Sequence, residues 1–298
     1  MKLLSWTVCR VVPWVLSVGL AVEAVAMPQE TLTADAIMAR VAANQDRVEA
    51  ERVRYVYVQH ARVVSRKGKT VMCEEVTDYR VTPLGDTSQR ELMKLDGHLL
   101  VKQRYVTYTS LPKKLGGDAV QVGDGSASVS LGDEDTDLDL VESMRSSFTD
   151  DKSKDGISKH LFPLTSKQQQ GYLFTLRGRE RVNGREVFHI VFKPKDKEDF
   201  DWKGDVFIDA EAFEPVVVRT DLAHKVPMAV RGLLGTNVPG LGFSVVYAPQ
   251  PDGVWLPVSF GTEFKIKVLF FFNREIIIDA QNREFQKTHV DSKIVAVE

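Results

Sequence analysis

Tyr172–Lys193 reads YLFTLRGRERVNGREVFHIVFK, and this stretch decides the fold class. Its two halves are rich in apolar and β-branched residues. They flank Asn183-Gly184, a pair that favours the type I′ turn of a tight β-hairpin. Phe188, Ile190 and Phe192 alternate along the second half, so they share one face of that strand. The stretch therefore predicts an antiparallel hairpin with one apolar face.

The sequence after this hairpin continues the same pattern. Alternating apolar segments recur between short turns, and one turn is marked strongly by the sequence PQPDG at residues 249–253. The predicted strands are Gly204–Asp209, Pro215–Asp221, Gly242–Ala248, Val254–Lys267 and Glu275–Gln286. Successive strands joined by short turns predict an antiparallel meander.

The sequence before the hairpin begins with a predicted helix that is capped by Thr33 and runs to about Ala50. Its apolar face consists of Ile37, Met38, Val41, Ala42 and Val48. This stripe carries no reactive group, which favours core packing over ligand binding.

Strand patterns follow this helix. Val53–Val64 and Lys69–Val81 are predicted to pair around a turn at Ser65–Gly68, and Glu91–Tyr108 is predicted to hold two strands around Asp96-Gly97. Cys73 lies in an alternating pattern and is expected to be a small buried hydrophobic residue.

The middle of the chain has a different character. Lys113–Gly132 is rich in Gly, Ser and Asp and predicts a loop or a weak pair of short strands. Asp133–Phe148 predicts a helix whose apolar face would be formed by Leu138, Val141, Met144 and Phe148. The apolar residues Leu161–Leu164 are expected to dock onto the sheet. We therefore expect a polar and helical insertion around residues 113–164.

Residues 1–26 have the pattern of a cleaved signal peptide. Lys2 and Arg10 are followed by the apolar run Val11–Val22, and Ala24-Val25-Ala26 supplies the small residues that signal peptidase requires. The run is shorter than the roughly 20 residues that a membrane-spanning helix needs. The pattern predicts export, cleavage after Ala26, and a periplasmic mature protein formed by one domain over residues 27–298.

Composition limits the class of partner. The net charge is −2, and it would become −3 on loss of Lys2, Arg10 and Glu23. Nucleic-acid-binding domains normally carry a strong basic excess, so a nucleic-acid partner is not expected. Cys73 would be the one cysteine left after cleavage, which excludes an intrachain disulfide.

Known catalytic and cofactor motifs are absent from the sequence. The six histidines are scattered without zinc-ligand spacing, and no nucleophile elbow, P-loop or dinucleotide-binding motif is present. Asp133, Asp135, Asp137 and Asp139 alternate, but an EF-hand loop starting at Asp133 would need Gly and Glu where Leu138 and Met144 stand. We therefore expect no enzymatic activity, no cofactor and no bound metal.

Several short segments resemble the LolA/LolB-like family of outer-membrane lipoprotein-sorting proteins. The helix start Ala34–Met38 follows a signal peptide, as in that family. Gly204–Asp209 with Pro215-Val216 resembles its strand–turn–strand unit, Gly253–Pro257 its next paired element, and Asp279–Phe285 its closing strand. The resemblance implies a mainly β (α+β) fold, an incomplete antiparallel β-barrel formed by a strongly curved sheet wrapped around an N-terminal helix and short helices. It also implies an apolar cavity for acyl chains.

The sequence thus predicts a periplasmic carrier of lipid or lipoprotein acyl chains, with envelope membrane proteins as further partners. Val226–Leu241 could form a short apolar helix on pliable glycines, either a lid or a structural plug. The tentative cavity residues are Phe188, Ile190, Phe192, Met228, Leu233, Leu234, Phe243, Val245, Phe264 and Ile266. Two alternatives stay open: a periplasmic sensor or regulatory binding module, and a hydrolase whose site assembles from distant residues.

Overall fold

The computed structural model describes most of the chain beyond its N-terminal 31 residues. The described residues are 32–84, 87–110, 119–122, 127–130, 136–148, 162–196, 202–222, 236–237, 242–268 and 272–288. The predicted signal peptide (1–26) and nearly all of Val226–Leu241 lie outside them. So do Phe270 and Phe271.

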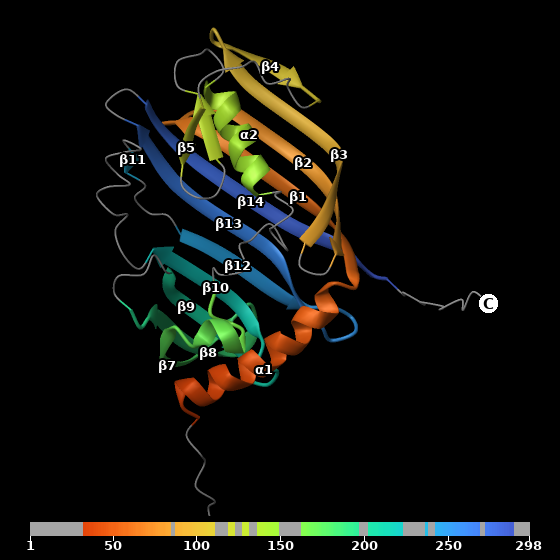
Figure 1. The fold of residues 1–298 in the computed structure, drawn as a ribbon, viewed down its shortest axis with the longest axis vertical. Coiled ribbons are helices and arrows are strands. Elements are labelled where there is room, and N and C mark those ends of the chain that lie inside the picture. The colour runs from red at the N-terminus through yellow and green to blue at the C-terminus, as the bar shows by residue number, and fades with distance from the viewer. Residues whose placement is uncertain are drawn as a thin grey trace, which may run out of the picture. The chain divides into compact units, whose positions relative to one another are not determined.

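Twelve of the described strands form one antiparallel sheet (Figure 1). The first group comprises β1 (Tyr55–Lys67), β2 (Thr70–Leu84), β3 (Thr87–Val101) and β4 (Arg104–Tyr108). The second group comprises β7 (Tyr172–Val182), β8 (Arg185–Pro194), β9 (Trp202–Asp209), β10 (Pro215–Leu222), β11 (Thr236–Asn237), β12 (Gly242–Pro249), β13 (Trp255–Val268) and β14 (Phe272–Lys287).

The sheet consists of two meanders joined by the first and last strands. The strand order is β4-β3-β2-β1-β14-β13-β12-β10-β9-β8-β7, with β11 paired to β13. Because the edge strands β4 and β7 do not pair, the sheet is not closed, and it is not strongly curled. The prediction of a mainly β, antiparallel fold is confirmed, whereas the strongly curved, incomplete barrel is corrected to an open sheet.

The hairpin that decides the fold class forms as predicted. Asn183 and Gly184 have φ angles of 50° and 79°, the two positive values that a type I′ turn requires. Tyr172 to Val182 then pair with Pro194 to Arg185 across the turn. A backbone preference of two adjacent residues therefore sets the register of this hairpin.

The turn predicted at Asp96-Gly97 is wrong. Gly97 lies inside β3, and the turn to β4 is made by Lys102 and Gln103, with φ angles of 46° and 67°. Gly97 is needed for a different reason: a Cβ atom there would lie 2.2 Å from the ring of Tyr108 on the neighbouring strand. The glycine makes room for an aromatic ring across the ladder.

The N-terminal helix α1 (Ala34–Arg52) forms with the predicted cap and the predicted apolar face. The Thr33 hydroxyl accepts a hydrogen bond from the backbone N–H of Ala36, and Ile37, Met38 and Val41 are fully buried. The side chain of Asn44 donates to the backbone carbonyls of Ala212 and Phe213, in the β9–β10 turn. These contacts fix α1 against one end of the sheet.

The chain between β4 and β7 contains α2 (Thr136–Phe148), the short helix α3 (Ser166–Gln169) and the paired strands β5 (Ala119–Val122) and β6 (Ala127–Ser130). Phe162 and Leu164 are buried, so the segment that contains them docks as expected. The helix α2 forms and Val141 of its predicted apolar face is buried, but Leu138 and Met144 are only half-buried. The buried residues of α2 are instead Asp137, Leu140, Val141, Ser143 and Arg145.

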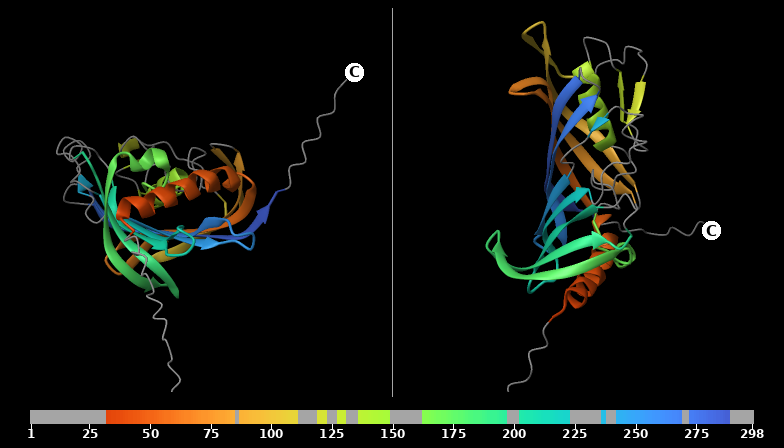
Figure 2. Two further views of the ribbon diagram at one scale, coloured as in Figure 1. Left: turned by 90° about the horizontal axis from the view of Figure 1, so that it is seen from below. Right: turned by 90° about the vertical axis from the view of Figure 1, so that its left-hand side faces the viewer.

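Both long helices lie on the same side of the sheet, as the two views in Figure 2 show. We call this side the inner face and define it by Ile190, Val218 and Ala280, which are buried. The opposite face of the sheet carries charged side chains such as Arg62 and Glu74, which form an ion pair at 2.6 Å. This is the alternation expected of an antiparallel sheet that is covered on one side.

Candidate functional site

The inner face is apolar across almost the whole width of the sheet. One row of laterally paired residues crosses ten strands and contains a single hydroxyl group and no charge. The row is Leu176, Ile190, Val206, Val218, Val245, Phe260, Ala280, Ala61, Thr77 and Leu95. A surface of this length can take up a large apolar area of a partner or ligand, and its side chains in this row carry no reactive group.

Three aromatic rings form a ladder on this face. The rings of Trp202 and Phe243 contact edge to face at 4.9 Å between centroids, and Phe243 contacts Phe260 at 5.3 Å. Phe260 is buried, whereas Trp202 and Phe243 are only half-buried. We call Trp202, Phe243 and Phe260 the aromatic ladder. Two of its three rings therefore keep part of their surface exposed.

The structure separates the predicted cavity residues into groups. Phe188, Ile190, Phe192 and Val245 are buried on the inner face. Phe188 stacks on Phe213 at 5.9 Å, and Phe213 in turn lies under Arg40 of α1, so this group belongs to the core near α1.

The remaining predicted residues are placed as follows. Phe243 is the middle ring of the ladder. Phe264 and Ile266 lie in β13, where their backbones pair with Ile276 and Arg274, and Met228, Leu233 and Leu234 lie outside the described residues. Sequence reasoning missed Trp202 and Phe260. The signal for Trp202 was its even-numbered spacing from Val206 and Ile208 along one strand.

A buried ion pair attaches the C-terminal half of α2 to the inner face. The guanidinium of Arg145 donates from Nε to Oε2 of Glu75 at 2.7 Å, and Tyr108 donates from its hydroxyl to Oε1 of Glu75 at 2.9 Å. Burial opposes the charge on Arg145, but the Glu75 carboxylate outweighs it and raises the pKa of Arg145 above its usual value. Burial also raises the pKa of Tyr108, so this phenol is neutral.

A second buried ion pair attaches the first turn of α2. Arg274 of β14 donates from Nε and Nη2 to the two carboxylate oxygens of Asp137, at 2.6 and 2.7 Å. The hydroxyl of Ser65 donates to Oδ1 of the same carboxylate at 2.7 Å. All three residues are buried, so Asp137 is held by protein donors on the sheet.

The buried Cys73 is not a nucleophile in this environment. Burial raises the pKa of its thiol to about 12, so the thiolate that would be needed for attack is not populated near neutral pH. Its Sγ lies 3.6 Å from the Tyr108 hydroxyl. The expectation of a small buried hydrophobic residue is confirmed.

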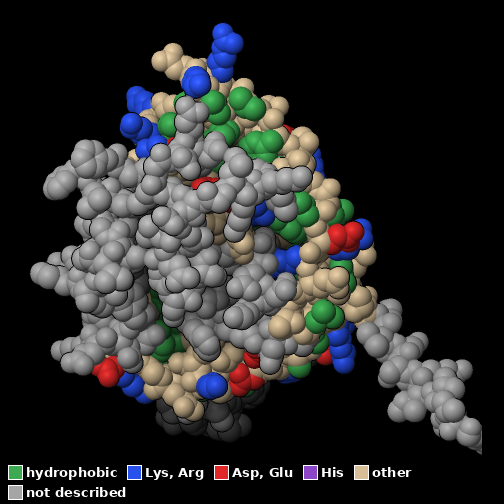
Figure 3. Space-filling model, turned by 45° about the horizontal axis from the view of Figure 1, so that its top comes forward, with side chains coloured by type: hydrophobic (Ala, Val, Ile, Leu, Met, Phe, Trp, Pro, Cys, Tyr) green, Lys and Arg blue, Asp and Glu red, His purple; other side chains and the backbone are tan. Residues whose placement is uncertain are grey.

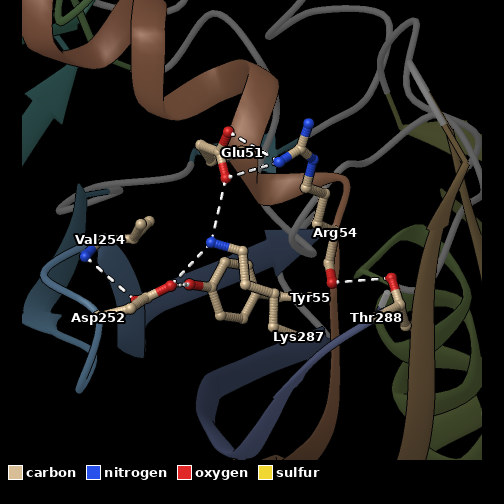
Figure 4. Close-up of polar contacts among 7 residues, drawn as sticks. All are labelled: Glu51, Arg54, Tyr55, Asp252, Val254, Lys287 and Thr288. Atoms are coloured by element: carbon tan, nitrogen blue, oxygen red, sulfur yellow. Dashed lines mark hydrogen bonds and ion pairs between the residues drawn. The ribbon is translucent and has the colours of Figure 1, made fainter. Parts of the chain in front are cut away.

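A polar cluster at the end of α1 serves attachment (Figure 4). Tyr55 donates to Asp252, and Lys287 bridges Asp252 at 2.8 Å and Glu51 at 3.2 Å. The hydrogen bonds from Lys287 and Tyr55 lower the pKa of Asp252 to about 2. Burial, and to a smaller extent the hydrogen bond to Asp252, raises the pKa of Tyr55 to about 12. The cluster joins α1, β14 and the turn before β13.

Another cluster lies on the opposite side of the sheet from the helices. His189 contacts Glu180 through Nδ1 at 2.9 Å and Asp205 through Nε2 at 2.6 Å, and its ring stacks on Phe207 at 4.7 Å. This agrees with the structural role expected of a strand histidine. Among the described residues, no group of three or more His, Cys, Asp or Glu side chains is placed to hold a metal ion.

Hydrophobic side chains are exposed at the β3–β4 end. Tyr105 and Val106 of β4 are 55% and 52% exposed, beside the exposed Lys102 and Arg104. Figure 3, in which this end comes forward, shows hydrophobic and basic side chains together there. No helix within the described ranges is long and apolar enough to cross a membrane.

Comparisons with known proteins find similarity in structure only. No family model matches the sequence, and no curated protein matches it. Solved structures do match. The chain is similar in structure to LolA-superfamily proteins.

Three solved structures illustrate this similarity. A domain named for outer membrane lipoprotein sorting, from Vibrio parahaemolyticus, has 11% identity and a TM-score of 0.37 over 86% of this chain and 95% of its own. A LolA-superfamily protein from Nitrosomonas europaea has 12% identity and a TM-score of 0.33, over 89% and 98%. A DUF1329 family protein from Desulfovibrio piger has 10% identity and a TM-score of 0.35, over 89% of this chain and 96% of its own. At these scores the function must be argued from this chain's own side chains.

Proposed function

We propose that the chain is a non-enzymatic binding protein that holds the acyl chain of a lipid or lipoprotein against the inner face of its sheet. The observation that carries the proposal is the half-buried aromatic ladder on a continuous apolar face. An acyl chain gains roughly 0.8 kcal/mol for each CH₂ removed from water, so apolar contact alone can supply the affinity. Ordering the ligand offsets part of that gain.

The chemistry of the face agrees with binding rather than catalysis. The face carries Cys73, whose thiol stays neutral, and Glu75, whose carboxylate accepts hydrogen bonds from Arg145 and Tyr108. Neither group is thus available as a nucleophile or a general base. A carrier in the periplasm, exported after cleavage behind Ala26, needs only a covered apolar surface that opens on contact. Met228, Leu233 and Leu234 are proposed to cover the bound chain.

The proposal is tested by changing the middle ring of the ladder. Phe243→Ala removes contacts to Trp202 and Phe260 and is expected to weaken binding of a fluorescent fatty acid at least tenfold, since a buried Phe side chain contributes about 1.5–3 kcal/mol. Tyr105→Ala is the matched control, because it removes an exposed aromatic ring at the sheet edge.

Two results would count against the proposal. Equal affinity of the Phe243→Ala and Tyr105→Ala proteins would remove the ladder from the site. Failure of the wild-type protein to bind any acyl ligand would remove acyl binding itself. Co-purification of an envelope protein without lipid would then favour a sensor or regulatory module.

A further inference from the structure

The attachment of α2 to the sheet is unusual for a surface helix. Among its five buried residues are the charged Asp137 and Arg145, near its two ends, with Leu140 and Val141 between them. Replacing a buried ion pair by apolar residues of similar volume is often neutral or stabilising, so such pairs are poor evidence of a stability role. The charges on α2 therefore call for a functional reason.

The Arg274 end has the geometry of an anion-binding site. The guanidinium presents two parallel N–H groups to two oxygens of one carboxylate, and the Ser65 hydroxyl supplies a third donor. This planar fork recognises carboxylates and phosphates equally well. Asp137 is thus an internal occupant of a site that would accept any small oxyanion.

The anion-binding site and the aromatic ladder lie on the same face of the sheet, separated along β14. Phe260 of the ladder is paired with Ala280 of β14, and Arg274 lies six residues before Ala280 on the same strand. Six residues of strand span roughly 20 Å. One leaflet of a bilayer, half of the roughly 30 Å hydrocarbon core, is about 15 Å thick. An acyl chain of about that length whose head group is at Arg274 would run along the inner face toward the ladder and end short of Phe260.

We propose that Arg274 and Ser65 bind the anionic head group of an amphiphile, a carboxylate or a phosphate, which takes the place of Asp137 and releases the N-terminal end of α2. The exchange leaves Arg274 paired, and it frees Asp137 to move into water. The Arg145–Glu75 pair, supported by Tyr108, keeps the other end of the helix attached. This inference rests on the proposed acyl binding and adds a head-group preference to it.

The test compares ligands with the same acyl chain and different head groups: a fatty acid, an alkyl phosphate and a neutral monoacylglycerol. The wild-type protein is expected to bind both anionic ligands at least about tenfold more tightly than the neutral one, as for a charged hydrogen-bonding partner. Hydrogen exchange in Thr136–Phe148 should rise with the anionic ligands only.

Three variants isolate the site. Arg274→Gln should abolish the preference while neutral binding remains, and Asp137→Asn should strengthen anionic binding by weakening the internal occupant. The double variant, Asp137→Asn with Arg274→Gln, contains no unpaired buried charge and serves if the single variant fails to fold. Arg66→Gln is the control, because Arg66 pairs with Glu275 rather than with α2.

The outcomes distinguish this inference from the proposed function. Equal affinity of the wild-type protein for anionic and neutral ligands would overturn the head-group site and leave acyl binding intact. If inorganic phosphate alone raised hydrogen exchange in α2 as strongly as the alkyl phosphate does, the ligand would be a free anion. That result would overturn the proposal that the ligand is an amphiphile. Absence of binding by all three amphiphiles would overturn both.

Discussion

The two long helices lie on the same side of the sheet but are attached in opposite ways. The face of α1 has Ile37, Met38 and Val41 fully buried, and Gln45 on this face donates a buried hydrogen bond to Glu214 at 2.6 Å. The face of α2 is fixed by two buried ion pairs. Separating α1 from the sheet would expose mainly apolar area, whereas separating α2 would expose Leu140 and Val141 and would also return buried charged groups to water. This difference is the basis of our proposal that α2 can be released while α1 stays in the core.

The largest effect is expected from the apolar face of α1. Met38→Ala should lower the free energy of unfolding by about 3 kcal/mol, because it leaves a cavity under a fully buried side chain. Denaturant unfolding measures this loss, and the exposed Arg47→Ala on the same helix is the control. A loss confined to local exchange in α1, with unchanged global stability, would break the comparison, since α1 would then also be releasable.

A smaller effect of opposite sign is expected from α2. The double change Glu75→Leu with Arg145→Met replaces a buried ion pair by apolar side chains and should stabilise the fold by about 1 kcal/mol. Hydrogen exchange in α2 should slow at the same time, because opening then exposes apolar area. Faster exchange in this variant would show that apolar side chains hold the helix less well than the ion pair does.

The smallest effect concerns pH. Burial raises the pKa of Glu214 above its usual value, and the hydrogen bond from Gln45 only partly offsets this. The stability that this group contributes is present below the unfolded pKa of about 4.3 and is lost as pH rises through the folded pKa. The melting temperature of Glu214→Gln should rise relative to that of the wild type as the pH is raised from 4 to 7. A difference independent of pH would mean that Glu214 ionises without cost against α1.

Local signals predicted the parts of the fold that depend on neighbouring residues. Asn183-Gly184 forms its turn because both residues tolerate positive φ, and Thr33 caps α1 because its hydroxyl reaches an N–H three residues away. Asp96-Gly97 gave a wrong turn prediction, because a glycine is also needed where an aromatic ring from the neighbouring strand lies directly over the backbone. The distinction depends on Tyr108, which becomes a neighbour of Gly97 only when β3 and β4 pair.

The candidate site depends on such long-range neighbours, which alternation along one strand does not reveal. Phe243 was predicted from its own strand, but Trp202 and Phe260 join it from two other strands. The buried face of α2 was missed for the same reason. Its apolar pattern pointed to Leu138 and Met144, whereas Glu75 and Arg274 on the sheet select the charged residues. That the sheet stays open could not be predicted from the strand patterns either.

Quenching of tryptophan fluorescence by a fatty acid that carries bromine atoms along its chain tests the central claim most directly. The wild-type protein should be quenched on binding. The quenching should persist in Trp255→Phe, where Trp202 remains, and should disappear in Trp202→Phe, since Trp202 is the half-buried tryptophan of the ladder. Equal quenching in the two variants, or quenching that depends on Trp255 alone, would contradict binding of the acyl chain at the aromatic ladder.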